Sequence, residues 1–386
     1  MSRGLRIGLV VSLALAFILS PGATMASHGR APLGTDDALA AQLQSIVDRG
    51  RTGRPMVGLG AVVTLADGSR WESGSGFTTS EATTQFSADT PTVIGSITKT
   101  FVAALILQLV EEGRLGLDDP LSRWFPSYRF ASQVTVRHLL SHTSGIKDYF
   151  LHSSYDSLVY GRPTYHWTTD EILTLVRPRL NFAPGTSWSY SNSNYVFLGL
   201  IAQRVIGKPL AAVLRGRFWK PLGMSRTYFQ GTDALPTDAA QGYLRRRDTW
   251  AGLADDSSYR PNTSTATVAW GAGNVLSSAA DIATWTRALY GGQVLTPESL
   301  GLMTTFNAAN YGLGTQQMLV DGVAAWGHTG SLRGYTAITW HLPSAGITVT
   351  VLTNRGRISP LPLATELTRA VLAALAAPAR ELRPAA

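Results

Sequence analysis

The chain has 386 residues, of which 45% are apolar and 15% charged, so it can bury a large core, which excludes an intrinsically disordered tail and a charged arm. The lack of cysteine excludes disulfides, thiolate zinc sites and a cysteine nucleophile. The formal charge of +8 comes mainly from arginines spread along the chain, densest at residues 245–247, so we interpret it as a solvated surface and expect no nucleic-acid partner.

The first 26 residues have the pattern of a secretory signal peptide. Arg3 and Arg6 precede an apolar stretch at residues 7–19, and mostly small residues follow it. The apolar stretch is shorter than the roughly 20 residues that a membrane-spanning helix needs. We therefore expect cleavage after Ala26, with Ala23 as the less favoured position, and a secreted protein without a stable membrane anchor.

Strand patterns occur near both ends of the chain. Asp36 can cap a helix that ends at Gly50, and the Asp-Gly pair at residues 67–68 then joins two strand-like segments in a hairpin. Similar strand patterns return only at residues 318–326, 337–342 and 347–352, before a final helix at about 361–375. We therefore predict that both ends of the chain contribute strands to one mainly antiparallel sheet.

The middle of the chain has helix signals at residues 101–112, 168–176, 195–206 and 279–290. These patterns predict an α/β fold of the α+β type, in which helices flank the sheet and a helical domain is inserted. We divide the mature chain into a discontinuous α/β domain (27–120 and 266–377), a helical domain (121–265) and a C-terminal tail (378–386). We expect the functional site in the cleft between the two domains.

Two segments carry a serine followed three positions later by a lysine, a pairing that can supply a nucleophile and a base. Ser144 and Lys147 flank Gly145 in a predicted turn, so their side chains need not meet. Ser96 and Lys99 begin a predicted helix, where side chains three positions apart share a face and the free N–H groups of the first turn favour an oxyanion. A simple N-cap is the alternative role for Ser96.

Two further polar motifs follow in the chain. Tyr190-Ser191-Asn192 comes after a turn at residues 183–185, and His328-Thr329-Gly330-Ser331 comes after a predicted strand at 323–326, where a sheet edge could face the cleft. Taken alone, each motif more often has a structural role, as a polar loop or as a histidine at the end of a strand. A metal site is not favoured, because the histidines do not form a ligand spacing such as HExxH.

Together the three motifs, in this order, closely resemble those of the serine penicillin-recognising family, which includes DD-carboxypeptidases, class C β-lactamases and related esterases and D-amino-acid peptidases. The third motif begins with His328, as in some DD-carboxypeptidases, where many relatives have lysine. The resemblance covers about residues 36–375 and includes flanking segments at 109–117, 138–145, 221–224 and 311–314. It implies a β-lactamase/transpeptidase-like fold and an active-site serine hydrolase.

The resemblance and the chemistry of the side chains assign roles to the motif residues. Ser96 is the expected nucleophile, Lys99 the base or proton relay, and Tyr190 the group that returns a proton to the leaving atom, although either Lys99 or Tyr190 could take the first proton. The backbone N–H groups of Ser96 and Ser331 would form the oxyanion hole. The expected substrate-binding residues are Asn192, Trp270, His328, Thr329, Gly330, Ser331 and Arg333.

Two of these substrate-binding residues have a further expectation attached. Trp270 resembles an aromatic cleft wall in the family, with core packing as the alternative. For His328 we expect a neutral imidazole, whose ionisation would fall within the working pH range of the enzyme because the reference pKa of histidine is about 6.5.

The implied reaction proceeds through an acyl-enzyme on a small-molecule or peptide substrate, without a cofactor, in a protein that we expect to be a monomer. D-alanyl-D-alanine carboxypeptidase or β-lactamase-related peptidase activity is favoured. Similar carboxypeptidases carry a cation on the strand before the third motif, whereas residues 314–318 have none. Arg333 could replace that cation if the chain stays extended after Ser331. An esterase and a penicillin-binding sensor with little turnover are the alternatives.

Overall fold

The computed structural model describes residues 37–54, 56–244 and 263–376. The predicted signal peptide (1–26), the arginine run (245–247) and the predicted tail (378–386) lie outside the described residues. Among the residues described, no single helix has the length and apolar character to cross a bilayer, and the adjoining helices Asn192–Ile206 and Leu210–Trp219 reach that threshold only as a pair bent by 76°.

The centre of the fold is a six-stranded antiparallel sheet in the order β2-β1-β9-β8-β7-β6. Its strands are β1 (Gly58–Thr64), β2 (Arg70–Gly76), β6 (Gln316–Val320), β7 (Val323–Leu332), β8 (Tyr335–Leu342) and β9 (Ile347–Thr353). Strand β1 pairs with β9, so segments from the two ends of the chain lie side by side in the sheet. This pairing confirms the prediction of one antiparallel sheet made from both ends.

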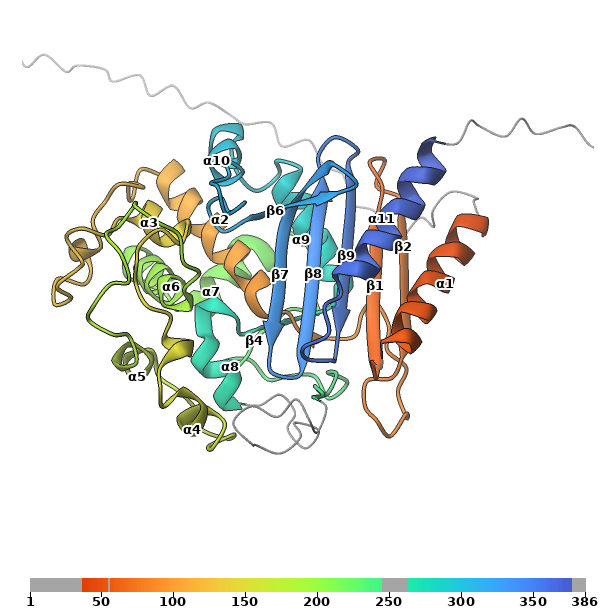
Figure 1. The fold of residues 1–386 in the computed structure, drawn as a ribbon, viewed down its shortest axis with the longest axis horizontal. Helices are drawn as coiled ribbons and strands as arrows, with labels where there is room; N and C mark the ends of the chain where they lie inside the picture. Colours follow the sequence, from red (N-terminus) through yellow and green to blue (C-terminus); the bar gives the residue numbers. More distant parts are fainter. Residues whose placement is uncertain (1–36, 55, 245–262, 377–386) are drawn as a thin grey trace, which may run out of the picture.

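Helices cover both faces of the sheet, which explains why β1, β8 and β9 are buried along their whole length. Helices α1 (Asp37–Gly53) and α11 (Leu361–Ala376) pack on one face, where alternate residues of β1, β8 and β9 meet their apolar sides. Helix α9 (Ala279–Tyr290) contacts β1, β8 and β9 and packs on the other face. Figure 1 shows α1 and α11 on the sheet and the helical region at the side of β7 and β6.

The middle of the chain folds into short helices around two longer ones. The longer helices are α2 (Thr98–Glu111) and α6 (Asn192–Ile206). The short helices are α3 (Val136–Leu140), α4 (Tyr155–Val159), α5 (Thr169–Thr174), α7 (Leu210–Leu214), α8 (Thr263–Ala269) and α10 (Pro297–Met303), and a small second sheet is formed by β3 (Thr92–Val93), β5 (Val275–Ser277) and β4 (Tyr228–Phe229). Helix α5 confirms the helix predicted at residues 168–176, and it begins with a capping box between Thr168 and Glu171.

Helix α2 lies between the sheet and the helical region and is buried on nearly every side. The ring of Phe101 stacks on Trp285 of α9, with ring centres 4.2 Å apart, and the indole N–H of Trp285 donates to Thr100 Oγ1. The same hydrophobic cluster includes Val62 of the sheet and Phe197 of α6. Because this core spans both regions, it fixes the start of α2 relative to both, while the domain boundaries at residues 120 and 265 stay a prediction.

Leu43 of α1 tests the contribution of the helix layer to stability, because its side chain is fully buried against the sheet. We expect Leu43→Ala to lower the free energy of unfolding by about 2–5 kcal/mol, through lost burial and the cavity left behind. Leu375→Ala is the matched control, because Leu375 is 56% exposed on α11 and should change stability by less than about 0.5 kcal/mol. Urea unfolding measures both, and equal effects would contradict this account of the layer.

Candidate active site

The amine of Lys99 is the centre of a cluster drawn from four elements. Ser96 lies in the 3-10 turn Gly95–Ile97, and Lys99 lies in the first turn of α2 that follows. Lys99 Nζ is 3.0 Å from Ser96 Oγ, 2.8 Å from Asn192 Oδ1 on α6 and 2.7 Å from the carbonyl oxygen of Ala272. The N-cap of α2 is Ile97, so the alternative role of Ser96 as a helix cap is wrong.

Burial controls the charge of Lys99. The side chain has no exposed surface, and this burial lowers the pKa of Lys99 to about 7, while the negative charge of Asp148 acts in the opposite direction. Asn192 Oδ1 and the Ala272 carbonyl can only accept hydrogen bonds. When Lys99 loses a proton, its two remaining N–H groups therefore stay on these acceptors, and its lone pair faces the Ser96 hydroxyl.

Tyr190 lies close to the Ser96–Lys99 pair. Its ring is 4.9 Å from Lys99 Nζ. Within the described part of the chain, the buried Tyr190 hydroxyl has no hydrogen-bond partner of normal geometry, and Ser96 is the only group that lowers the pKa of this phenol. Burial outweighs Ser96 and raises the pKa of Tyr190 well above its usual range, so the phenol keeps its proton at neutral pH.

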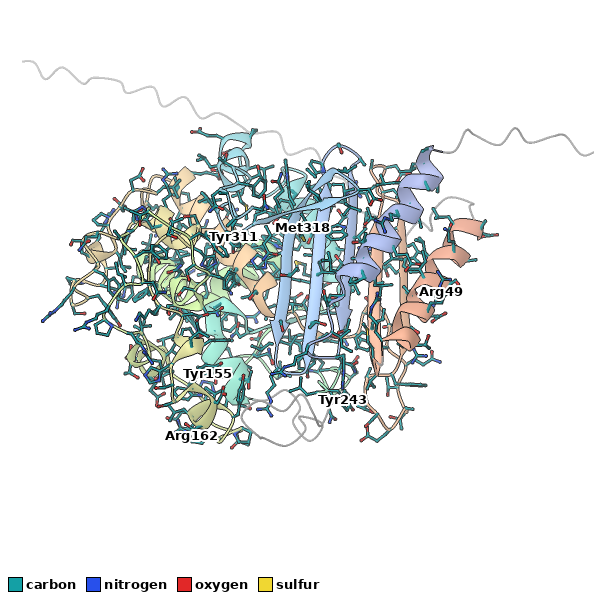
Figure 2. All side chains as sticks on the ribbon, viewed as in Figure 1. Arg49, Tyr155, Arg162, Tyr243, Tyr311 and Met318 are labelled. Atoms are coloured by element: carbon teal, nitrogen blue, oxygen red, sulfur yellow. The ribbon has the colours of Figure 1, made fainter. Side chains whose placement is uncertain are left out.

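The third motif lies inside strand β7, which corrects the prediction that the strand ends at residue 326, before the motif. His328 is fully buried, its Nδ1 contacts the carbonyl oxygen of Thr329, and its Nε2 is 3.0 Å from the hydroxyl of Tyr311. The carbonyl requires a proton on Nδ1, so Nε2 accepts a hydrogen bond from Tyr311. Tyr311 lies between the helical region and strands β6 and β7 (Figure 2).

His328 is neutral in this environment. Burial and the nearby charge of Lys99 lower the pKa of His328 to about 3. The neutral form expected from the sequence agrees with this value, but an ionisation of His328 within the working pH range does not. The sequence argument used the reference pKa of an exposed histidine and did not include full burial.

Two glycines allow β7 to approach the nucleophile turn closely. A Cβ atom on Gly330 would lie 1.9 Å from the carbonyl oxygen of Ile94, and one on Gly95, which has a φ of +53°, would lie 2.7 Å from Ser331 N. The backbone of Ser331 therefore runs directly beside Gly95 and Ser96. An oxyanion hole made from the N–H groups of Ser96 and Ser331 requires this approach.

A cavity of about 580 Å³ opens above these groups, between β7 and the helical region. The predicted residues that line it are Ser96, Tyr190, Asn192, His328, Thr329, Gly330, Ser331 and Arg333. Trp270 is not among the lining residues, and its ring packs at Gly199 of α6, as the core-packing alternative predicted.

The structure corrects the geometry expected for Arg333. Strand β7 ends at Leu332, so Arg333 lies in the turn before β8 and not in an extended chain. Its guanidinium lies 4.3 Å from the centre of the Tyr160 ring. The direction of the Arg333 side chain is therefore set by this turn and by the contact with Tyr160. It is not set by the alternation of side chains between the two faces of a strand.

Several residues of the site were not recognised in the sequence as functional candidates. Asp148 Oδ2 accepts a hydrogen bond from Asn192 Nδ2 at 2.8 Å, and Gln316 Oε1 accepts from both the N–H and the hydroxyl of Thr329. No local pattern marks Asp148 or Gln316, because each meets its partner only through the fold. Tyr311 belongs to the flanking segment 311–314, which was noted for resemblance alone.

The second serine–lysine pair does not form a comparable site. Ser144 Oγ donates to Asn194 Oδ1 at 2.7 Å, and Asn194 Nδ2 is 3.1 Å from Nδ1 of the buried His142. The same His142 nitrogen accepts from the Ser191 N–H, between Tyr190 and Asn192. This network therefore supports the backbone of the second motif. Within the described ranges, no group of acidic or histidine side chains is arranged to hold a metal ion.

Comparisons with known proteins agree with this geometry. The family model described as Beta-lactamase matches residues 43–373. Esterase EstB of Burkholderia gladioli is 31% identical over 373 residues, which cover 85% of this chain and 94% of the esterase. Penicillin-binding protein 4 of Amycolatopsis lactamdurans is 28% identical and covers 77% of this chain and 80% of its own length. The structure of D-amino acid amidase from Ochrobactrum anthropi SV3 superposes with a TM-score of 0.76 at 27% identity, covering 88% of this chain and 99% of the amidase.

The lowered pKa of Lys99 makes a testable prediction about nucleophilicity. The rate at which a fluorophosphonate labels Ser96 should rise with pH through about 7, because deprotonation exposes the amine lone pair to the serine hydroxyl. Lys99→Met should lower the plateau rate by about 100-fold or more and abolish this rise, with the far-ultraviolet circular dichroism unchanged. Labelling rates measured from pH 5 to 9 check this, and a flat wild-type profile would remove Lys99 as the base.

Proposed function

The chain belongs to the Beta-lactamase family of serine hydrolases, and on this basis we propose that it hydrolyses small esters and amides through an acyl-enzyme on Ser96. The observation that carries the proposal is the position of Lys99 Nζ, 3.0 Å from Ser96 Oγ, together with a pKa of about 7 for this amine. A lysine can activate a serine only in its unprotonated form, which this pKa makes available near neutral pH.

In the proposed acylation, Ser96 Oγ attacks the carbonyl carbon of the substrate and its proton passes to Lys99 Nζ. The negative charge on the carbonyl oxygen is held by the N–H groups of Ser96 and Ser331. Tyr190 relays the proton to the leaving alcohol or amine, as the carbon–oxygen or carbon–nitrogen bond breaks. Water then attacks the acyl-enzyme with the same groups acting in reverse, releases the acid and restores Ser96.

The proposed substrate preference follows from the polar groups at the far side of the cavity. Gln316 contributes a neutral amide beside Thr329, and His328 is neutral because its pKa is about 3. A carboxylate binds best to a cationic side chain, whereas both of these groups are neutral. They therefore suit a neutral carbonyl or ester oxygen better than a carboxylate. The similarity to an esterase and to an amidase supports the same preference.

D-alanyl-D-alanine carboxypeptidase is the second candidate activity, and Arg333 is the observation that favours it. This cation lines the cavity close to Ser331 and is held over the Tyr160 ring. A guanidinium at this position could pair with the terminal carboxylate of a peptide.

We also propose that the protein is secreted and acts as a monomer. The proposal of secretion is based on the signal-peptide pattern of residues 1–26.

Intact-mass spectrometry distinguishes these activities. We expect a short-chain p-nitrophenyl ester to acylate wild-type protein transiently and to be turned over, and Ser96→Ala to give no adduct, because the nucleophile is lost. Penicillin and a D-Ala-D-Ala peptide are the comparison substrates. Stable one-to-one acylation by penicillin without turnover of any substrate would instead support a sensor, and an adduct that persists in Ser96→Ala would refute acylation at this serine.

Arg333→Ala tests the carboxypeptidase candidate. If turnover of esters and amides is the main activity, the substitution should change kcat/KM on a neutral ester by less than about twofold, because no carboxylate is bound. The same variant is measured on a D-Ala-D-Ala peptide, with Arg162→Ala as the control because Arg162 also packs on an aromatic ring but does not line the cavity. A loss confined to the peptide would make the carboxypeptidase the better assignment.

A further inference from the structure

We propose that Asp148 is a positioning residue of the active site, which holds Asn192 in the orientation that directs the lone pair of Lys99 at Ser96. The inference rests on the proposed function and adds to it a residue that does not line the cavity. It starts from the hydrogen bond of 2.8 Å between Asn192 Nδ2 and Asp148 Oδ2.

The side chain of Asn192 lies between two groups of opposite hydrogen-bonding character. On one side Lys99 Nζ donates to Oδ1 at 2.8 Å, and on the other side the carboxylate of Asp148 accepts from Nδ2. Rotation of the amide by 180° would place two acceptors against each other at Asp148 and two donors against each other at Lys99. The carboxylate therefore selects one of the two amide orientations, and a neutral side chain at position 148 would select it less strongly.

Asp148 is itself held against the start of α6. Its Oδ1 accepts from the N–H of Phe150 at 3.1 Å, which caps the 3-10 turn Tyr149–Leu151. On either side of Asp148, the Tyr149 N–H donates to Ser193 Oγ and Ser193 Oγ donates to the carbonyl of Lys147. The segment 147–149 is therefore tied to the residue next to Asn192, which leaves the carboxylate little freedom to move away.

The orientation of Asn192 decides where the lone pair of Lys99 points. Neutral Lys99 has two N–H groups and one lone pair, and three neighbours compete for these positions. Asn192 Oδ1 and the Ala272 carbonyl occupy both N–H groups only while Oδ1 faces Lys99. If the amide turned, an N–H group of Lys99 could point at Ser96 Oγ, and the lone pair needed to accept the serine proton would be misdirected.

The charge of Asp148 also influences the titration of Lys99. Asp148 raises the pKa of Lys99 against the larger effect of burial, and burial raises the pKa of the Asp148 carboxyl. The other titratable groups around the amine are Tyr190, Tyr195, His142 and His328. The pKa of each tyrosine is raised and that of each histidine is lowered, so these four are neutral near pH 7, whereas Asp148 is the acidic group whose charge acts on Lys99.

The experiment measures fluorophosphonate labelling of Ser96 from pH 5 to 9, together with thermal unfolding, in the full-length protein. Asp148→Asn should lower the plateau rate by about tenfold and move the midpoint of the profile to lower pH, because a negative charge near Lys99 is lost. Asp148→Glu, which keeps the carboxylate, should recover part of the rate. Asp156→Asn is the control, because Asp156 lies in the neighbouring helix α4 and should leave the rate and midpoint unchanged.

A double variant separates positioning from capping. If Asp148 acts through Asn192, then Asp148→Asn added to Asn192→Ala should lower the plateau rate by less than about twofold, although the midpoint still moves. If Asp148→Asn does not fold, Asp148→Ser keeps a side-chain cap for Phe150 but is too short to hold Asn192, and the same loss of rate is expected. Wild-type rate and midpoint in a folded Asp148→Asn or Asp148→Ser would overturn the inference. Absence of labelling in the wild-type protein would instead overturn the proposed function.

Discussion

The candidate site depends on the removal of one lysine amine from water. An exposed lysine is protonated at neutral pH and cannot act as a base, so the fold must cover the amine without providing enough negative charge to restore its usual pKa. Lys99 meets this condition because its polar neighbours are mainly neutral acceptors, the Asn192 amide and the Ala272 carbonyl. Asp148 is separated from the amine by Asn192, and its effect is smaller than that of burial.

This requirement explains the position of α2 in the fold. The amine of Lys99 can be shielded from water only if α2 is covered on all sides. The residues that cover α2 come from the sheet, from α9 and from α6. The nucleophile must nevertheless reach substrate, and Ser96 lies in the turn before α2, where the cavity opens. The same short segment therefore places its lysine in the core and its serine at the surface of the cavity, a division that a 3-10 turn leading into a helix makes possible.

The parts of the site that could be predicted from sequence are those that local geometry determines. The spacing of Ser96 and Lys99 has the same meaning in any helical turn, and the Asp-Gly hairpin and the capping box of α5 are equally local. Asp148 and Gln316 could not be identified in this way, because their partners belong to other segments of the chain. The extended conformation predicted for Arg333 was wrong. The end of β7 depends on where the β7–β8 turn forms, and the apolar pattern of the sequence does not indicate that position.

The pairing of β1 with β9 has a consequence for the order of assembly. The first hairpin of the chain can complete its pairing only after β9, the last strand, has been made, and β7 must be in place before Ser331 can lie beside Gly95. Contacts between such distant segments slow folding, because a long loop must close before they form. A chain that lacks the final strands therefore cannot place Ser331 beside Gly95, so the oxyanion hole proposed for Ser96 can be completed only late in folding.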